Sequence, residues 1–353
     1  MKKTILIFRV NILLLIVTLI ISCENQEVAP GDDDKAVFLS FSSNGQTLPT
    51  SINGVDHRVV LEVDHDVDVT RLIPEFDIPD GYSVYVNGLQ QISGSSIVDF
   101  SQPVSYTLKD KNNRSTTWQT SVVPLACKIL IDASHDGGVW WFPQYEGTGF
   151  NANEWHQGQV FANLLREKGF EVNELGRGQE LKEEMFFGHY IVIRVNGFQP
   201  YTTREREVYT NLVNRGMKMV FFTDHKKFDP IDELGDHLGL KFEGSANGVV
   251  TTFMPHPITE NMVFINYVAG AVLTNANENT SVEVLGWLGE DDFADLNFNG
   301  IKDANEPVSM PVMGILNYPN SRIFFIGDTN GIEQQPQPFI DNLITWMGTC
   351  FER

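Results

Sequence analysis

The hydrophobic pattern changes near residue 128, and this change limits the possible fold more than any other feature of the chain. Before it, apolar and polar residues alternate in short segments that turn sequences separate, with no long helical period. After it, continuous apolar runs such as residues 128–132 alternate with amphipathic helical segments. We therefore expect a β-sandwich over residues 36–125, followed by an α/β domain over residues 126–353.

The strand spacing predicts the type of each domain. In the first domain, whose spacing is typical of an immunoglobulin-like sandwich, strands are expected at residues 37–41, 58–63, 83–86, 104–108 and 117–123. In the second domain, strands are expected at residues 128–132, 190–195, 217–222, 311–316 and 322–326, and helices near residues 155–169, 203–215, 230–238 and 338–347. This alternation predicts a mostly parallel, doubly wound (flavodoxin-like) sheet that helices cover on both faces.

The start of the chain has the pattern of an export signal. Basic residues precede a short apolar run at residues 12–21, which is too short to span a bilayer. Ile20-Ile21-Ser22-Cys23 resembles a bacterial lipobox, which implies a signal peptide over residues 1–22 and a lipid on Cys23. An uncleaved anchor, or an ordinary signal peptide with an incidental cysteine, is the alternative.

Residues 23–35 are polar and charged, with an Asp32-Asp33-Asp34 triplet, and are expected to form a flexible acidic tether. This stretch resembles the surface-export signal of lipoproteins from polysaccharide-degrading Gram-negative bacteria. The resemblance implies an outer-membrane protein that the lipid anchors at the cell surface, with the periplasmic face as the alternative location. The formal net charge of -21 excludes nucleic acid as a partner, because the phosphate backbone would be repelled.

Three cysteines are present, and Cys23 is expected to carry the lipid. The other two, Cys127 and Cys350, precede the first strand and follow the last helix of the second domain. Helices run antiparallel to the strands in a doubly wound sheet, so the two thiols are expected to be close enough for a disulfide. Two inert thiols remain the alternative.

The first domain resembles a recurrent N-terminal module of surface lipoproteins. The resemblance lies in Asp68-Val69-Thr70-Arg71-Leu72-Ile73-Pro74-Glu75-Phe76, Ser93-Gly94 and Asp99-Phe100-Ser101-Gln102-Pro103-Val104-Ser105-Tyr106-Thr107. It implies a spacer that lifts the next domain off the membrane. A sugar-binding face is the sharper alternative, and it would need exposed aromatic side chains. Tyr82, Tyr85 and Trp118 are the candidates, but core or cross-strand packing is the favoured role for each of them.

The second domain resembles the class I glutamine amidotransferase-like fold, and most closely its ThuA-like branch. The residues that carry this likeness are Asn214-Arg215-Gly216, Thr223-Asp224-His225, Leu234 to Gly239, Pro255-His256-Pro257-Ile258-Thr259-Glu260-Asn261 and Phe325-Ile326-Gly327-Asp328. The glutaminases of this fold carry a Gly-x-Cys-x-Gly nucleophile motif, where this chain has Phe222-Thr223-Asp224-His225-Lys226. Glutaminase chemistry through a thioester is therefore excluded.

Polar residues follow several of the predicted parallel strands, at the edge where such sheets bind ligands. The candidates for catalysis or metal binding are His135, Asp136, Asp224 and His225, and Asn196 and Asp328 are candidates for ligand binding. In the loop after the first strand, Trp140, Trp141 and Tyr145 are candidates for stacking on sugar rings. The alternatives are that the polar residues cap neighbouring backbone and that the aromatic residues pack within their own loop.

Residues 295–306 match the twelve-residue calcium loop at every ligand position. The predicted ligands are Asp295, Asn297, Asn299, the carbonyl of Ile301, Asp303 and Glu306. Gly300 occupies the position of the sharp turn. No amphipathic helix pair flanks the loop, so we expect an insertion near residues 291–307 that binds Ca²⁺ in a structural role. A polar turn without metal is the alternative.

These observations favour an accessory carbohydrate-binding lipoprotein that takes part in glycan uptake or degradation. A glycan hydrolase that uses His135, Asp136, Asp224 and His225 is the first alternative. A structural interaction module of a surface complex is the second. The expected partners are the membrane, through the lipid anchor, a glycan and a surface protein complex.

Overall fold

The structure is a computed structural model that describes residues 36–135, 158–176, 178–195, 197, 199–227, 232–329 and 337–348. The predicted signal peptide, Cys23 and the tether lie outside these residues. None of the helices in the described ranges is long and apolar enough to cross a membrane.

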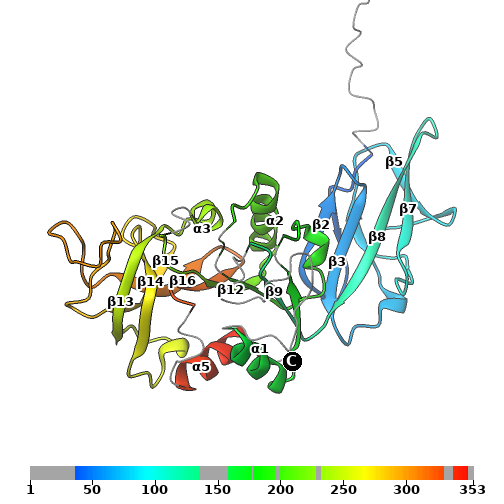
Figure 1. Cartoon of the computed structure of the whole chain (residues 1–353). Coiled ribbons are helices and arrows are strands. Elements are labelled where there is room, and N and C mark those ends of the chain that lie inside the picture. The colour runs from blue at the N-terminus through cyan, green and yellow to red at the C-terminus, as the bar shows by residue number, and fades with distance from the viewer. Residues whose placement is uncertain are drawn as a thin grey trace, which may run out of the picture. The chain divides into compact units, whose positions relative to one another are not determined.

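The N-terminal module consists of a six-stranded and a two-stranded sheet (Figure 1). The larger sheet has the order β2-β3-β8-β7-β5-β6, in which only the β3–β8 pair is parallel. The strands are β1 (Ser40–Ser42), β2 (Gln46–Asn53), β3 (Arg58–Asp64), β4 (Glu75–Asp77), β5 (Tyr82–Val86), β6 (Leu89–Gln90), β7 (Val104–Asp110) and β8 (Ser115–Leu125). A short 3-10 helix, η2 (Val69–Arg71), follows β3. The first strand was predicted at residues 37–41, but in the structure it is the three-residue β1, which begins at Ser40 and pairs with β4.

Aromatic side chains fill the core of this module. Trp118 and Tyr106 are fully buried, and Phe38 contacts both edge-on, at centroid distances of 5.5 Å and 5.9 Å. The Trp118 indole N–H donates to the carbonyl of Ala36 at 2.9 Å, which satisfies its buried donor. The buried position of Trp118 agrees with core packing and removes it from the possible sugar-binding residues, because a ring in the core cannot stack on a ligand.

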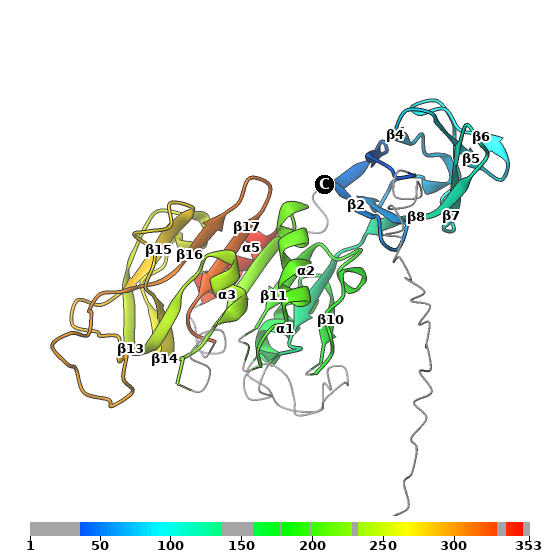
Figure 2. The ribbon, with the colours of Figure 1, turned by 90° about the horizontal axis from the view of Figure 1, so that it is seen from above.

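The C-terminal domain contains a nine-stranded mixed sheet with the order β10-β9-β11-β12-β17-β16-β15-β13-β14 (Figures 1 and 2). Five neighbouring strands are parallel: β10 (Glu171–Leu175), β9 (Lys128–Asp132), β11 (Ile191–Arg194), β12 (Lys218–Phe222) and β17 (Arg322–Ile326). Four antiparallel strands extend the sheet: β16 (Pro311–Asn317), β15 (Val282–Leu288), β13 (Phe242–Phe253) and β14 (Ile265–Leu273). The predicted class, a β domain followed by an α/β domain with a largely parallel sheet, is confirmed.

Helices cover both faces of the parallel part of the sheet. One apolar cluster joins the sheet to α1 (Gln159–Glu167) and α5 (Gln337–Met347). A second cluster on the opposite face joins it to α2 (Thr203–Asn214) and α3 (Glu233–Leu238). Figure 1 shows these two pairs on opposite sides of the sheet. Two 3-10 helices complete the domain, η3 (Glu183–Met185) and η4 (Pro257–Thr259).

Local signals fix the ends of α2. Thr202 and Glu205 form a reciprocal capping box at the first turn, which satisfies two backbone donors. Gly216, just after the helix, has φ +87°, and a Cβ there would lie 2.9 Å from the carbonyl oxygen of Asn320. The glycine of the Asn214-Arg215-Gly216 motif is therefore required by the turn that leads the chain into β12.

Candidate functional site

Charged and polar side chains gather where the parallel strands end. Asp132 ends β9 and Arg194 ends β11, while Asp224 and Asp328 follow β12 and β17 closely. These four strands lie side by side in the sheet, so their carboxyl ends share one edge. All four side chains are buried.

Asp132 organises one hydrogen-bond network at this edge. Its Oδ1 accepts bonds from the backbone N–H and the hydroxyl of Ser134 at 3.0 Å and 2.6 Å. Its Oδ2 accepts from the hydroxyls of Tyr209, at 2.5 Å, and Tyr201, at 3.4 Å. Burial, and after it the adjacent Asp132 carboxylate, raise the pKa of both phenols well above the usual value, so they remain donors.

His135 extends this network to α2. Its Nδ1 lies 2.7 Å from the Ser134 hydroxyl and its Nε2 lies 3.4 Å from Oε2 of Glu205. The imidazole also stacks on Tyr201, with 3.8 Å between ring centroids. Burial favours a higher pKa for Glu205, but hydrogen bonds from Thr202 and Leu181 and the nearby His135 outweigh it and lower the pKa. Both ring nitrogens of His135 thus have protein partners.

A buried ion pair lies at the centre of the sheet edge. Arg194 donates from both terminal nitrogens to Asp232, at 2.9 Å and 2.6 Å, and each side chain is only 1% exposed. Asp232 also caps α3 through the N–H of Gly235 at 2.9 Å. Burial favours a higher pKa for Asp232, but Arg194 and then Lys226 outweigh it and hold the pKa well below the usual range. Sequence reasoning did not identify this pair.

Asp224 forms a separate network with Thr329, whose hydroxyl donates to its Oδ2 at 2.5 Å. Burial raises the pKa of Asp224 to about 6. His225 is half-buried, and burial followed by the charges of Lys226 and Lys227 lowers its pKa. Asp328 accepts a bond from the N–H of Val268 at 2.7 Å.

The candidate catalytic residues are thus divided between two networks. β11 lies between β9 and β12, so the strand ends that carry His135 and Asp224 are about 10 Å apart at ordinary strand spacing. His135 contacts Ser134 and Glu205, whereas Asp224 bonds to Thr329. The remaining predicted residues of this edge, Asp136, Trp140, Trp141, Tyr145 and Asn196, lie outside the described residues.

The predicted calcium loop is ordered by its own oxygen atoms. Asp295 accepts bonds from the N–H groups of Asn299 and Gly300 at 3.1 Å and 2.8 Å. Glu306 accepts from those of Leu296 and Asp303 at 2.8 Å and 2.9 Å. Gly300 has φ +76°, as the sharp turn requires.

The donor chemistry of this loop fits Ca²⁺, because its ligating groups are carboxylate, amide and carbonyl oxygens. Its carboxylates are nevertheless not gathered as tightly as those of a closed metal site. In the described part of the chain, only Asp64, His65 and Asp66 bring three acidic or imidazole ligand atoms within 4.8 Å of one another. That group is largely exposed and lies in the N-terminal module.

Two other sequence features have structural explanations. His256 of the Pro255–Asn261 motif caps η4, because its Nδ1 accepts the N–H of Ile258 at 3.1 Å. Asn342 of α5 donates to the carbonyl of Ile258 at 3.2 Å, so the motif also anchors this helix.

Cys127 is disulfide-bonded, and its predicted partner Cys350 lies outside the described residues.

Comparison with known proteins finds distant structural neighbours and one family model. The structure of the N-terminal domain of mmIFT52 is 14% identical over 63% of this chain and 97% of its own, with a TM-score of 0.46. A ThuA-like protein from Parabacteroides merdae is 14% identical over 64% of this chain and 89% of its own, with a TM-score of 0.37. A protein described as a glycoside hydrolase from Bacteroides thetaiotaomicron is 23% identical over 29% of this chain and 28% of its own, with a TM-score of 0.23.

These scores are too low to support conclusions about function, and none of the curated proteins is significantly similar to the chain. The sequence comparison is more specific. Residues 38–122 match the family model described as SGBP, N-terminal, in which SGBP denotes surface glycan-binding proteins. This match relates the N-terminal module, and not the α/β domain, to the surface glycan-binding proteins.

Proposed function

We propose that this protein is an accessory surface glycan-binding protein that holds a carbohydrate without cleaving it. The observation that carries the proposal is the match of residues 38–122 to the N-terminal domain of surface glycan-binding proteins. The α/β domain would take part in recognition, since the module resembles a spacer and its largest aromatic side chain is buried.

Asp232 and His135 at the sheet edge are already bonded to protein groups, which favours a binding role for this part of the edge. A general acid or base needs a titratable group within hydrogen-bond reach of the substrate. The carboxylate of Asp232 is neutralised by Arg194, and the imidazole of His135 contacts Ser134 and Glu205. These groups hold one another and stabilise the loops that carry them.

A glycan array followed by calorimetry tests the proposal. The full chain, purified in detergent, is expected to bind a restricted set of oligosaccharides, and their amounts are expected to be unchanged after long incubation. Failure to bind any glycan would contradict the proposal and favour the structural interaction module.

A glycan hydrolase is the second candidate, and the position of His135, Asp224 and His225 at the carboxyl edge of the parallel strands is the observation that favours it. If it is correct, His135→Ala and Asp224→Ala each abolish turnover while the melting temperature changes little. Product formation that survives both substitutions would exclude these residues from catalysis.

Two further parts of the proposal concern the anchor and the metal. We propose that Cys23 carries a lipid that holds the protein at the outer membrane, facing the cell surface. A Cys23→Ser variant is then expected to leave the membrane fraction and to incorporate no labelled palmitate. We also propose that residues 295–306 bind Ca²⁺ in a structural role.

A further inference from the structure

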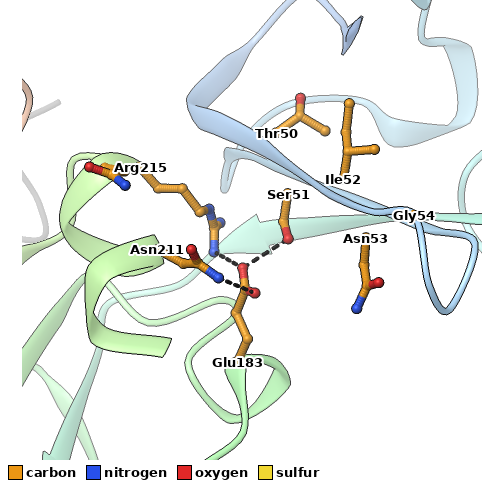
Figure 3. A pocket seen from close by; sticks show the side chains of 9 residues that line it. Thr50, Ser51, Ile52, Asn53, Gly54, Glu183, Asn211 and Arg215 are labelled. Carbon is orange, nitrogen blue, oxygen red and sulfur yellow. Dashed lines mark hydrogen bonds and ion pairs between the residues drawn. The ribbon is translucent and has the colours of Figure 1, made fainter. Parts of the chain in front are cut away.

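A polar groove, which we call the junction groove, lies between the N-terminal module and the α/β domain (Figure 3). One wall is the end of β2 and the turn after it, and the other is formed by η3 and the end of α2. One pocket of the groove has a volume of about 330 Å³ and is lined by Thr50, Ser51, Ile52, Asn53, Gly54, Glu183, Asn211, Asn214 and Arg215. A second pocket of about 410 Å³ shares Asn53, Glu183 and Asn211 with it, so the groove continues along α2.

Glu183 is the central polar group of the junction groove. Its Oε1 accepts a bond from the Ser51 hydroxyl at 2.8 Å, and its Oε2 accepts one from the Asn211 amide at 3.3 Å. Figure 3 shows these bonds converging on the carboxylate from both walls. The side chain is 22% exposed, so a ligand can still reach its remaining lone pairs.

Arg215 provides a buried donor at the base of the groove. Its side chain is only 7% exposed; Nε donates to the carbonyl of Pro49 at 3.2 Å, and Nη2 bonds to Glu62. Within the described residues, Nη1 has no hydrogen-bond acceptor, and it forms an ion pair with Oε1 of Glu183 at 3.5 Å. A buried guanidinium N–H without an acceptor is uncommon, and it indicates that an acceptor from outside the chain belongs there.

The charges of the groove indicate what kind of acceptor fits. Two carboxylates, Glu62 and Glu183, flank the single guanidinium of Arg215, so the base of the pocket carries a net negative charge. A carboxylate or sulfate group would be repelled there. A sugar hydroxyl fits both requirements, because it accepts from Nη1 and donates to Glu183. The amide of Asn211 supplies a further donor, and Asn214 lines the same pocket.

Contacts of Glu62 within the protein hold the two walls together in the absence of a ligand. Glu62 is fully buried, and its Oε1 accepts the N–H of Gly188 at 2.7 Å while its Oε2 pairs with Arg215. Such pre-organisation lowers the entropy that binding must overcome. The module therefore contributes part of a preformed pocket.

We propose that the junction groove binds a neutral glycan, with Arg215 and Asn211 donating to its hydroxyls and Glu183 accepting from them. The inference rests on the proposed glycan-binding function and assigns to it a site that both domains build. It predicts that the N-terminal module takes part in recognition, in addition to any role as a spacer.

Calorimetry with a neutral oligosaccharide that the wild-type chain binds tests the inference. Asn211→Ala and Asn214→Ala each remove an exposed groove side chain, and each is expected to weaken binding by roughly three- to tenfold, the effect of one hydrogen bond. Glu183→Gln keeps the shape of the groove and is expected to weaken the neutral glycan similarly while improving binding of its uronic-acid counterpart. Glu75→Gln, an equivalent change on the exposed β4 strand, serves as the control.

The outcomes separate the two proposals. A wild-type chain that binds no glycan overturns both. Glycan binding that persists unchanged in Asn211→Ala, Asn214→Ala and Glu183→Gln overturns the groove while the proposed function stands. Melting temperatures within a few degrees of wild type are required of the variants. If one of the three variants fails to fold, the glycan affinities of the other two test the groove.

Discussion

The Arg194–Asp232 pair predicts a large and specific loss of stability when its charge is broken. Asp232→Asn leaves a guanidinium buried with 1% exposure and no counter-charge at 2.6 Å. Removing one partner of a buried ion pair costs about 3–5 kcal/mol. Asparagine can still accept the N–H of Gly235 that caps α3, so the loss reports the charge and not the cap. We expect a melting temperature lower by roughly 6–20 °C.

The pH dependence of this loss has a definite sign. The pKa of Asp232 is held far below its usual value, so its stabilising effect is complete above the unfolded-state pKa of about 3.9. The effect is lost progressively as the pH falls from the unfolded-state pKa to the lower pKa of the folded state. The difference between wild type and Asp232→Asn should therefore be constant from neutral pH down to about pH 5 and shrink in stronger acid.

Two controls make the measurement by urea and thermal denaturation interpretable. Glu243→Gln breaks the exposed pair with Lys241, at 3.0 Å, and should cost less than about 1 kcal/mol. The double change Arg194→Met with Asp232→Asn keeps the cap of α3 and removes the unpaired guanidinium, so it should recover the part of the loss that this buried charge causes. An Asp232→Asn variant within about 1 kcal/mol of wild type would refute the reasoning.

Three further predictions concern other parts of the chain. Burial raises the pKa of Glu174 to about 8. In thermal denaturation, Glu174→Gln should match the stability of the wild type near pH 4 and exceed it progressively, by on the order of 3 kcal/mol, as the pH rises to 8. If residues 295–306 bind Ca²⁺, added calcium should raise the melting temperature of the wild-type chain but not of Glu306→Gln. Cys127→Ser should lower stability by about 2–4 kcal/mol, and dithiothreitol should reproduce the loss in the wild-type chain only.

The parallel core of the fold could be predicted from the sequence because its strands are buried on both faces. Such strands are continuous apolar runs, and residues 128–132 and 322–326 became β9 and β17 with the predicted bounds. Strand β10 was missed because it is an edge strand, and Glu171, Asn173 and Glu174 hide its pattern.

Of the antiparallel extension, β16 was predicted, at residues 311–316, whereas β13, β14 and β15 were missed for a different reason. β13 changes register between Glu243 and Gly248, so its apolar residues do not keep a period of two. Gly244, with φ +67°, lies in the same irregular stretch. A pattern search therefore finds polar and glycine-rich sequence where the structure has a twelve-residue strand, Phe242–Phe253.

The shared sheet edge of the candidate residues was predictable, but their pairing was not. Asp224 and Asp328 were predicted at the carboxyl ends of parallel strands, and the strands that they follow, β12 and β17, are neighbours in the sheet. The partner of Arg194 lies 38 residues away, and no local pattern specifies it. An arginine that ends an apolar strand is nevertheless a signal that a buried counter-charge exists, and it was overlooked.

Strand β3 gives the strongest reason to regard the two domains as one functional unit. It is a central strand, between β2 and β8, and alternate residues face opposite sides. Val59 and Leu61 belong to the core of the module, whereas Glu62 faces the other way and is fully buried against Arg215.

Burying a carboxylate on a central strand is costly unless a counter-charge is present. Glu62 of the module therefore needs Arg215 of the α/β domain as its partner. Glu62→Ala should lower stability by about 3–5 kcal/mol, because it leaves Arg215 without its main counter-charge. The paired change Glu62→Leu with Arg215→Met should restore stability but still weaken glycan binding, because the donor at the base of the groove is gone. Recovery of both stability and binding would show that the junction is only a structural contact.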